Sequence, residues 1–449
     1  MTLPIEEAER AQLTDLERAV FETPLCDTHE HIAYEADWVA DKGDVLADLV
    51  RNYVGDDLRN AGAEYDAILR ALEPTSAELK DRLEGVLPAL EGCRHTGYGE
   101  VVSLMLRHIY GLESVTVETL TAAQPILDSL KKGGERLRLL REVGKVDHVQ
   151  IDDFCWRCLP DESGPDFFFY DISWQSFCSA SFDVAEIKEE TGVEVKDLPT
   201  LEETMRGIFR KYGPCAIAVK SQHAYNRTLD WRERDEADVR KVLEKKLAGQ
   251  ELSEEETLCL GDWGWAKGVE LTIEHELPFK THTGYYAGIG GMPVRRIPPG
   301  NLCSLLAKYE NARFLLMHIG YPYQDEIVAL AKHFPNVTVD MCWSWAIDPY
   351  SAKDFLRRML HAAPVNKVMV YGGDTRNPTA SLAYSIHARS WLAKTLEEEI
   401  GDGFLTEPEA VEVAQNWMHR NQYEYFQVEK KRETIHNWNG PRLGGGPQA

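Results

Sequence analysis

Six residues that can bind metals or carry protons follow short apolar stretches of this sequence. Imidazole nitrogen and carboxylate oxygen are donors that divalent transition metals accept, and lysine nitrogen can join them once it is neutral. The sequence therefore predicts a metal site with one or two ions, for which we expect zinc, with manganese or iron as alternatives. The six residues are His29 and His31 in PLCDTHEHI, Lys220 in CAIAVK, His282 in FKTHTG, His318 in FLLMHIG and Asp374 in VMVYGGD.

The spacing of these residues suits a shared ion. His29 and His31 are two residues apart, so at the end of a strand both side chains point to the same side. His282 and His318 each stand two residues before a glycine, which allows a sharp turn. Asp374 is predicted to be the general base, because a carboxylate beside a metal can take a proton from the activated water. His318 is expected to be either a further ligand or a group that polarises the substrate carbonyl.

Lys220 ends an apolar run, where a charged lysine would be costly to bury. A neutral lysine beside metal ions can take up carbon dioxide and become a carbamate that bridges two cations. Two other interpretations stay open from the sequence: Lys220 contacts an anionic substrate directly, or it pairs with an acidic residue.

Four further residues are candidates for substrate binding. Arginines close to a metal site often bind carboxylate or phosphate, so we expect a small anionic substrate. The alternatives are an ordinary salt bridge for each arginine and core packing for the tryptophan. The four candidates are Tyr225, Arg227, Arg376 and Trp343.

The elements that must position these residues alternate between apolar strand-like runs and helical segments, which is typical of a parallel α/β fold. Polar residues at the carboxyl ends of strands are where a (β/α)8 barrel builds its active site. We expect the first strand near 23–27 and the third at 146–154, whereas 101–111 could be the second strand or a helix. The aromatic run 167–177 is interpreted as an extended loop over the barrel mouth or a core patch. Strands four to eight are expected within 215–220, 277–284, 312–320, 336–343 and 366–374.

The 449 residues are compatible with one barrel that carries insertions. Residues 35–140 show helical patterning that is far longer than an ordinary connection, so we interpret them as a helical insertion and a candidate lid. A helix is also expected from about residue 5 to 20, and one interrupted by glycine over 253–276. The predicted organisation is a single domain over 1–449 that contains the insertion.

Composition narrows the range of partners. The chain has 49 Lys and Arg against 74 Asp and Glu, a net charge of −25, which disfavours nucleic acid and anionic membranes as partners. Nine scattered cysteines fit a reducing compartment, and the amino-terminal segment lacks the pattern of a signal peptide. We therefore expect a cytoplasmic protein that acts on a small molecule, and we expect it to be a homo-oligomer.

The donors and their surrounding motifs resemble the amidohydrolase superfamily of the amidohydrolase-2 type. The segments that carry this resemblance are KSQHAYNRTLDW, HTG, HIGYPYQDE, PNVTVDMCW and KVMVYGGDTRN. They especially resemble the amidohydrolase-like domain that is found fused to glutamine-synthetase-like proteins. The resemblance covers about residues 23–428 and implies a distorted (β/α)8 barrel with metal donors on strands one, four, five, six and eight. The family's HxH pair falls on His29 and His31, its lysine on Lys220, its later histidines on His282 and His318, and its aspartate on Asp374.

The resemblance implies a hydrolase that uses activated water to attack an amide or a lactone of a small carboxylated molecule. Two features leave alternatives open. Several amidohydrolase-2 members are decarboxylases that bind one metal without the lysine, and the DTRN and MCWSW segments here are similar to uronate isomerases. A scaffold without catalysis is disfavoured, because none of the expected donors is missing.

Overall fold

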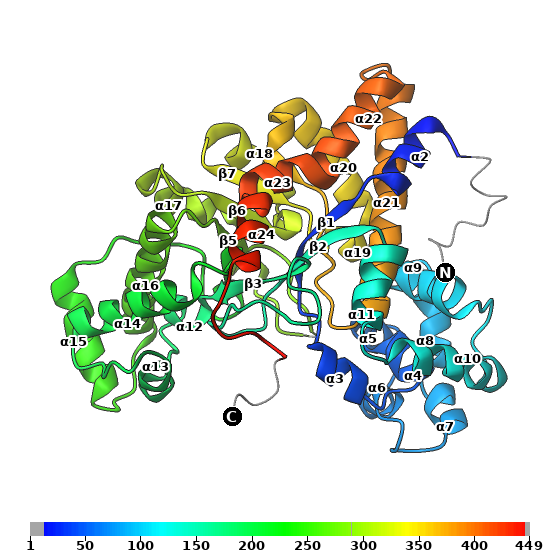
Figure 1. Ribbon diagram of the computed structural model, residues 1–449, viewed down its shortest axis with the longest axis horizontal. Helices are drawn as coiled ribbons and strands as arrows, with labels where there is room; N and C mark the ends of the chain where they lie inside the picture. The colour runs from blue at the N-terminus through cyan, green and yellow to red at the C-terminus, as the bar shows by residue number, and fades with distance from the viewer. Residues whose placement is uncertain (1–12, 289, 445–449) are drawn as a thin grey trace.

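A computed structural model describes residues 13–288 and 290–444 and contains eight parallel strands that are hydrogen-bonded in chain order (Figure 1). Backbone bonds from the Thr28 amide to the Tyr371 carbonyl and from the His31 amide to the Thr375 carbonyl join the first strand to the chain after the last. These bonds close the sheet, so the expected (β/α)8 barrel is confirmed. The strands are β1 (Leu25–Glu30), β2 (Val146–Ile151), β3 (Phe168–Ser173), β4 (Ala218–Ser221), β5 (Phe279–His282), β6 (Phe314–Met317), β7 (Val337–Asp340) and β8 (Val368–Met369).

The strands are short and almost wholly buried, as expected for parallel strands whose outer face is covered by helices. Inside the barrel, Phe169, Leu315 and Met369 form a cluster with Phe426 and Ile435 from the last two helices. These helices, α23 (Asn421–Phe426) and α24 (Val428–His436), therefore cover the end of the barrel where the strands begin. The opposite end, where the strands finish, is left for the predicted donors.

Between β1 and β2 the chain is helical throughout, and these helices lie together on one side of the barrel beside the long helix α21 (Pro378–Gly401) (Figure 1). Side-chain oxygens of Asp44, Thr96 and Thr116 cap three of them. The helices are α3 (Glu35–Ala40), α4 (Val45–Val50), α5 (Val54–Asn60), α6 (Tyr65–Leu72), α7 (Leu79–Glu84), α8 (Leu87–Gly92), α9 (Gly97–Leu104), η1 (Met105–Tyr110), α10 (Val117–Leu130), α11 (Glu135–Arg138) and η2 (Leu139–Val143).

Two assignments near the first strands differ from expectation, and one that the sequence left open is decided by the structure. The segment 101–111 forms the end of α9 and η1 and not a strand, because Val101, Met105 and Ile109 recur every four residues along one buried helical face. As a result, the run expected to be the third strand is β2. The aromatic run that was expected to be a loop or a core patch supplies β3. The sequence did not indicate this strand because it is buried on both faces and so shows no alternation of apolar and polar residues.

The other helices pack around the barrel. A helix was expected from about residue 5 to 20, and its part up to residue 12 lies outside the described residues. The described part is α2, which begins at Asp15. Helix α16 is continuous where a glycine interruption was expected: a Cβ at Gly268 would lie 2.3 Å from Trp174 Nε1, so this glycine permits close packing. The helices are α2 (Asp15–Glu22), α12 (Gln175–Cys178), α13 (Val184–Thr191), α14 (Leu198–Tyr212), η3 (His223–Tyr225), α15 (Glu236–Leu247), α16 (Glu254–Glu274), η4 (Val294–Arg296), η5 (Pro299–Leu302), α17 (Cys303–Lys308), η6 (His318–Gly320), α18 (Gln324–His333), α19 (Ser344–Ile347), α20 (Pro349–Ala362), η7 (Val365–Lys367), α22 (Glu407–Gln415) and η8 (Asn416–Arg420).

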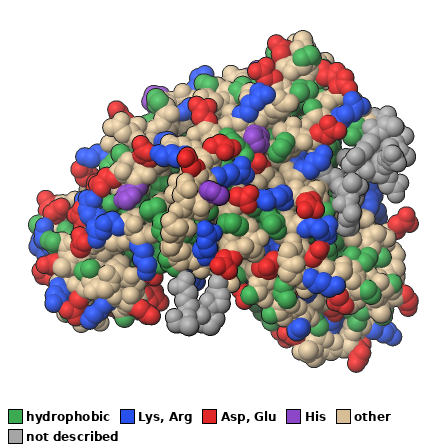
Figure 2. All heavy atoms as spheres, viewed as in Figure 1, with side chains coloured by type: hydrophobic (Ala, Val, Ile, Leu, Met, Phe, Trp, Pro, Cys, Tyr) green, Lys and Arg blue, Asp and Glu red, His purple; other side chains and the backbone are tan. Residues whose placement is uncertain are grey.

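The surface carries acidic and basic side chains that are intermixed over the face shown in Figure 2. Among the described helices, none has the length and apolar character required to cross a membrane.

Candidate metal centre

The six predicted donors meet where β1, β4, β5, β6 and β8 end. Asp374 Oδ1 lies 3.5 Å from His29 Nε2 and 3.2 Å from His31 Nε2, and Asp374 Oδ2 lies 3.9 Å from His318 Nε2. The Lys220 ammonium nitrogen is 3.1 Å from His29 Nε2. The sixth residue, His282, places its ring 4.3 Å from the ring of His318, measured between centroids. The structure therefore brings all six together.

The chain reaches this arrangement through left-handed backbone conformations. His318 and Asp374 have φ angles of 66° and 56°, which non-glycine residues seldom adopt. The neighbouring glycines are needed for close approach. A Cβ on Gly284 would lie 2.5 Å from the carbonyl carbon of Gly320, and a Cβ on Gly373 would lie 2.0 Å from Glu30 Oε1. Strained conformations of this kind concentrate at functional sites.

The hydrogen bonds of the imidazoles decide which nitrogen faces the centre. His31 Nδ1 lies 2.5 Å from the Asp152 carbonyl oxygen, and His318 Nδ1 lies 3.0 Å from the Cys342 carbonyl oxygen. A carbonyl can only accept, so Nδ1 carries the hydrogen in both rings and Nε2 keeps its lone pair when the ring is neutral.

The lone pairs then converge on a carboxylate. His31 Nε2 faces Asp374 Oδ1, and such a contact needs a cation between the two atoms, either a proton or a metal ion. Within residues 13–288 and 290–444, the buried Nε2 of His318 has no hydrogen-bond partner. The donor atoms of His29, His31 and Asp374 all lie within 4.8 Å of one another. These residues therefore fit a divalent metal.

Burial and charge set the protonation states that metal binding requires. Burial lowers the pKa of His29 and of His282 well below the usual value, and lowers that of His318 to about 4. Burial by itself would raise the pKa of Asp374, but the adjacent His31 and the charge of Lys220 outweigh it and hold this pKa below its usual range. At neutral pH these three imidazoles are uncharged and the carboxylate is ionised.

A second layer of buried polar groups supports the donors. The Lys280 ammonium donates to Asp171 Oδ2 at 2.7 Å and to the Thr28 carbonyl at 2.7 Å, which fixes β1 next to the donors. Asp27 accepts hydrogen bonds from the amides of His29 at 3.2 Å and Gly373 at 3.3 Å, and so ties β1 to the turn that carries the general-base candidate. These contacts pre-organise the site.

A cavity of about 540 Å³ lies over the donors, and His31, His282 and Asp374 line its floor. Part of its wall comes from the helical segment between β1 and β2, which was expected to be a candidate lid, although none of its residues was predicted to line the site. In particular, the Tyr53 hydroxyl donates to the Asp374 carbonyl at 2.6 Å. The available signal was the short RNY sequence between two helical segments. The other wall residues are Arg51, Asn52, Phe154, Gln175, Gln222, Tyr225, Asn226, Ala287, Thr375 and Arg376.

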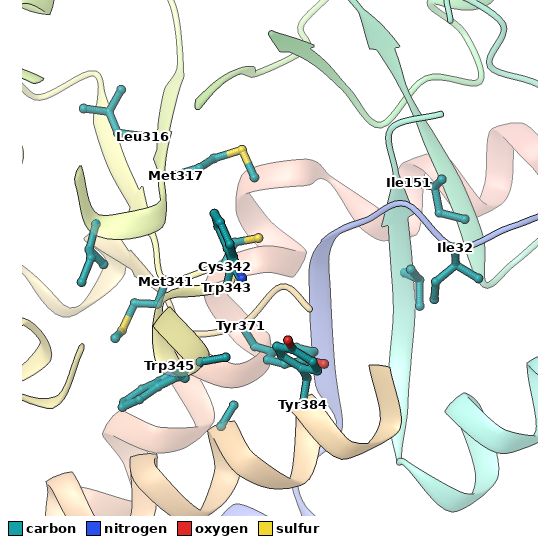
Figure 3. Packing of buried hydrophobic residues seen from close by; sticks show 14 of the residues in the cluster. Ile32, Ile151, Leu316, Met317, Met341, Cys342, Trp343, Trp345, Tyr371 and Tyr384 are labelled. Atoms are coloured by element: carbon teal, nitrogen blue, oxygen red, sulfur yellow. The ribbon is translucent and has the colours of Figure 1, made fainter. Parts of the chain in front are cut away.

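The four substrate-binding candidates divide into two pairs. Tyr225 and Arg376 line the cavity. Arg227 is 5% exposed and its Nη2 lies 2.5 Å from Asp262 Oδ1, so the structure places it in a buried ion pair. Trp343 is 1% exposed and packs against Tyr53, with ring centroids 4.5 Å apart. Figure 3 shows Trp343 beside Cys342 within this apolar packing. Arg227 therefore matches the salt-bridge interpretation, and Trp343 matches the core-packing interpretation.

The two arginines should therefore respond differently to substitution. Arg376→Ala should weaken binding of glutarate, used as a dicarboxylate probe of the metal-loaded protein, about tenfold, and should leave the unfolding temperature unchanged. Arg227→Ala should lower the free energy of unfolding by about 1–3 kcal/mol, because Asp262 loses one of its buried partners. Calorimetric titration and thermal unfolding measure the two effects. Weaker glutarate binding at unchanged stability in Arg227→Ala would place Arg227 in the binding site.

Comparison with known proteins agrees with this geometry. The family model Amidohydro_2, described as amidohydrolase, matches residues 221–412. Protein fluG of Emericella nidulans is 23% identical over 230 residues, which are 49% of this chain and 26% of that protein. The chain thus spans about a quarter of the length of this relative. The family match and this relative confirm the resemblance that was inferred from the motifs.

Solved structures show the same fold along nearly the whole chain. A uronate isomerase from Thermotoga maritima has a TM-score of 0.77 at 16% identity, with 93% of this chain and 97% of that chain covered. A glucuronate isomerase from Caulobacter crescentus has a TM-score of 0.79 at 14% identity, covering 95% and 96%. A protein assigned provisionally as a metal-dependent hydrolase, from Lactobacillus casei, has a TM-score of 0.65 at 13% identity, covering 93% and 99%. At these identities the likeness establishes the fold alone.

Proposed function

We propose that this chain, a member of the amidohydrolase superfamily of the amidohydrolase-2 type, is a metal-dependent hydrolase. Its reaction is the attack of water on an amide C–N bond or a lactone of a small anionic substrate. The observation that carries this proposal is the convergence of His29, His31 and His318 on the Asp374 carboxylate at a cavity that His31 and Asp374 line.

His29, His31 and Asp374 are the first ligands in this proposal, and His282, His318 and Lys220 are the further ones. A divalent metal bound there would lower the pKa of water and polarise a carbonyl. Since His318 Nδ1 is committed to the Cys342 carbonyl, its Nε2 lone pair favours the ligand role over hydrogen-bond donation to a substrate.

Asp374 is the general base in this proposal. Its carboxylate is ionised, lines the cavity floor and can accept a proton from the attacking water. The Tyr53 hydroxyl holds the backbone carbonyl of Asp374, and the Gly373 amide on the preceding residue is held by Asp27. These contacts fix the carboxylate, which can then return the proton to the leaving group. Arg376 in the cavity wall supplies positive charge for an anionic substrate, whereas Arg51 also lines the wall but is paired with Asp41 at 2.8 Å.

A second candidate is an aldose–ketose isomerase of a uronate on the same barrel. It is favoured by the two solved isomerases that overlay more than nine-tenths of this chain. A decarboxylase on the same metal-binding barrel is a third possibility from the same family. The hydrolase, the isomerase and the decarboxylase would use the same donors. They are distinguished by which atoms of the substrate and of water appear in the products.

Isotope labelling distinguishes these reactions. The metal-loaded protein, assayed in ¹⁸O-water with a panel of carboxylated amides and lactones, should place ¹⁸O in the new carboxylate of at least one product. In deuterium oxide, D-glucuronate should remain unchanged and unlabelled. Conversion of glucuronate with deuterium entering carbon, and no amide or lactone hydrolysis, would replace the hydrolase proposal with the isomerase. Release of carbon dioxide from the panel would indicate the decarboxylase.

A further inference from the structure

A second cavity adjoins the active-site cavity. It has a volume of about 760 Å³, and Phe154 and Gln175 belong to the walls of both cavities. Its other walls come from the loop after β2, the end of β3 and helix α13. In Figure 1, α13 lies on the opposite side of the barrel from the helices between β1 and β2. A molecule that is bound over the donors can therefore extend past Phe154 into a separate space.

Phe154 forms the boundary between the cavities. Its ring stacks on His31 with centroids 4.5 Å apart and planes 7° from parallel, although the side chain is 51% exposed. The Phe154 amide donates to Asp152 Oδ1 at 2.9 Å, and the carbonyl of the same aspartate accepts from His31. The ring is therefore held in place beside a metal-ligand candidate and presents an apolar surface between two polar spaces.

The two cavities differ in charge. Arg51 and Arg376 line the active-site cavity. The second cavity is lined by Glu186 and Glu189, which make no ion pair with any residue in the described part of the chain, and by Glu190, which pairs with Lys211 at 2.5 Å. Arg157 also lines it, is exposed and makes no ion pair with any residue in the described part of the chain. The second cavity therefore carries three carboxylates against two cationic side chains, and Glu186 and Glu189 are the carboxylates left outside an ion pair.

A buried hydroxyl in the same wall supports a polar occupant. Ser173 ends β3 and is 5% exposed, and it lines the second cavity. Its side chain borders the cavity, where a hydroxyl can donate to or accept from a polar occupant. Ser173 is the register partner of Lys220 on β4, so this hydroxyl lies one strand away from the predicted donors.

We propose, as an extension that rests on the hydrolase assignment, that the substrate is an amide with two polar parts. The carboxylated acyl part lies over the donors, beside Arg376. The amine part passes Phe154 and places a positively charged group near Glu186 and Glu189. During hydrolysis the C–N bond breaks and a C–O bond to the oxygen of water forms. One proton from water moves through Asp374 to the leaving nitrogen, so the products are a carboxylic acid and a diamine.

The charge contribution is modest, because Glu186 and Glu189 are exposed to solvent. Exposed ion pairs each change an equilibrium by a few-fold at most, so two of them should favour a cationic substrate by about threefold to tenfold. Screening by salt should reduce this preference.

The test compares two amides of matched length. N-(4-aminobutyl)succinamic acid ends in an ammonium group, and N-pentylsuccinamic acid ends in a methyl group. With the metal-loaded full chain, we expect kcat/KM to be about threefold to tenfold higher for the ammonium compound. The variant Glu186→Gln/Glu189→Gln should lose this preference and keep its activity on the pentyl compound. The matched control Glu244→Gln/Glu251→Gln alters net charge equally at exposed positions elsewhere and should keep the preference.

Calorimetric binding of the same two compounds separates this inference from the hydrolase proposal. Hydrolysis of both compounds without an ammonium preference, or a preference that survives in Glu186→Gln/Glu189→Gln, would overturn the role of the second cavity alone. Binding that favours the ammonium compound and depends on both glutamates, without hydrolysis, would support the cavity and overturn the hydrolase. Equal binding of both compounds without hydrolysis would overturn both.

Discussion

Replacing His29 with alanine is expected to remove bound metal and catalytic activity together. His29 is fully buried, and its Nε2 lies 3.5 Å from Asp374 Oδ1 and 3.1 Å from the Lys220 nitrogen. Loss of a supporting outer contact typically weakens metal binding 10–100-fold, so loss of a ligand should weaken it by at least about 100-fold. Metal analysis after dialysis, together with the rate constants for hydrolysis, measures both effects.

His333→Ala provides the control, because His333 is exposed at the end of α18, away from the donors. This variant should keep its metal and its activity, and circular dichroism should show that both variants are folded. Near wild-type activity with stoichiometric metal in His29→Ala would remove His29 from the proposed ligand set.

Replacing Lys220 with alanine is expected to cost the second metal ion and most of the activity. Lys220 is fully buried beside the histidine cluster, where a neutral amine can react with carbon dioxide to form a carbamate and release a proton. Such a carbamate would be an anionic bridge between two cations. The metal-to-protein ratio should therefore fall by about half, and short carboxylic acids such as acetate or propionate should partly restore activity by filling the gap.

Lys220→Met separates the loss of volume from the loss of the amine. It should recover stability relative to the alanine variant, because methionine fills a similar space, and it should not recover the second metal. Carbon-13 NMR after loading with ¹³CO₂ should show a carbamate resonance in the wild type that both variants lack. A cationic substrate clamp would instead keep the metal and mainly raise KM. An unmodified lysine together with one fully occupied metal would contradict the carbamate and favour the one-metal isomerase or decarboxylase.

The meeting of the proposed donors could be predicted from local sequence because each of them lies near the end of a strand or in the loop that follows it. In a parallel barrel the strands all end at the same face, so polar residues at those ends must meet even when they are hundreds of residues apart. His29 and Asp374 show this directly: they stand at opposite ends of the sequence, and their side chains lie 3.5 Å apart. The spacing of His29 and His31 and the glycines after His282 and His318 were sufficient to indicate a shared centre.

Local pattern was not sufficient near the first strands. The run 167–177 shows no alternation because β3 is buried on both faces, and the run 101–111 is also rich in large apolar residues although its buried positions recur every four residues. Packing decided the outcome. Residues 101–110 lie among other helices beside α21, and residues 168–173 pair with β2 and β4.

The sequence by itself predicted the barrel, the meeting of the six proposed donors and the acidic character of the chain, because these depend on residue type and on position relative to strand ends. Only the tertiary structure decided which arginine faces the substrate. Arg227 is neutralised by Asp262, a residue 35 positions away on another helix, whereas Arg376 lines the cavity. It also decided that Arg51 and Tyr53 of the helical segment line the mouth, and that a second cavity continues past Phe154. Contacts of this kind are made between separate elements by packing, and neither composition nor periodicity within one segment encodes them.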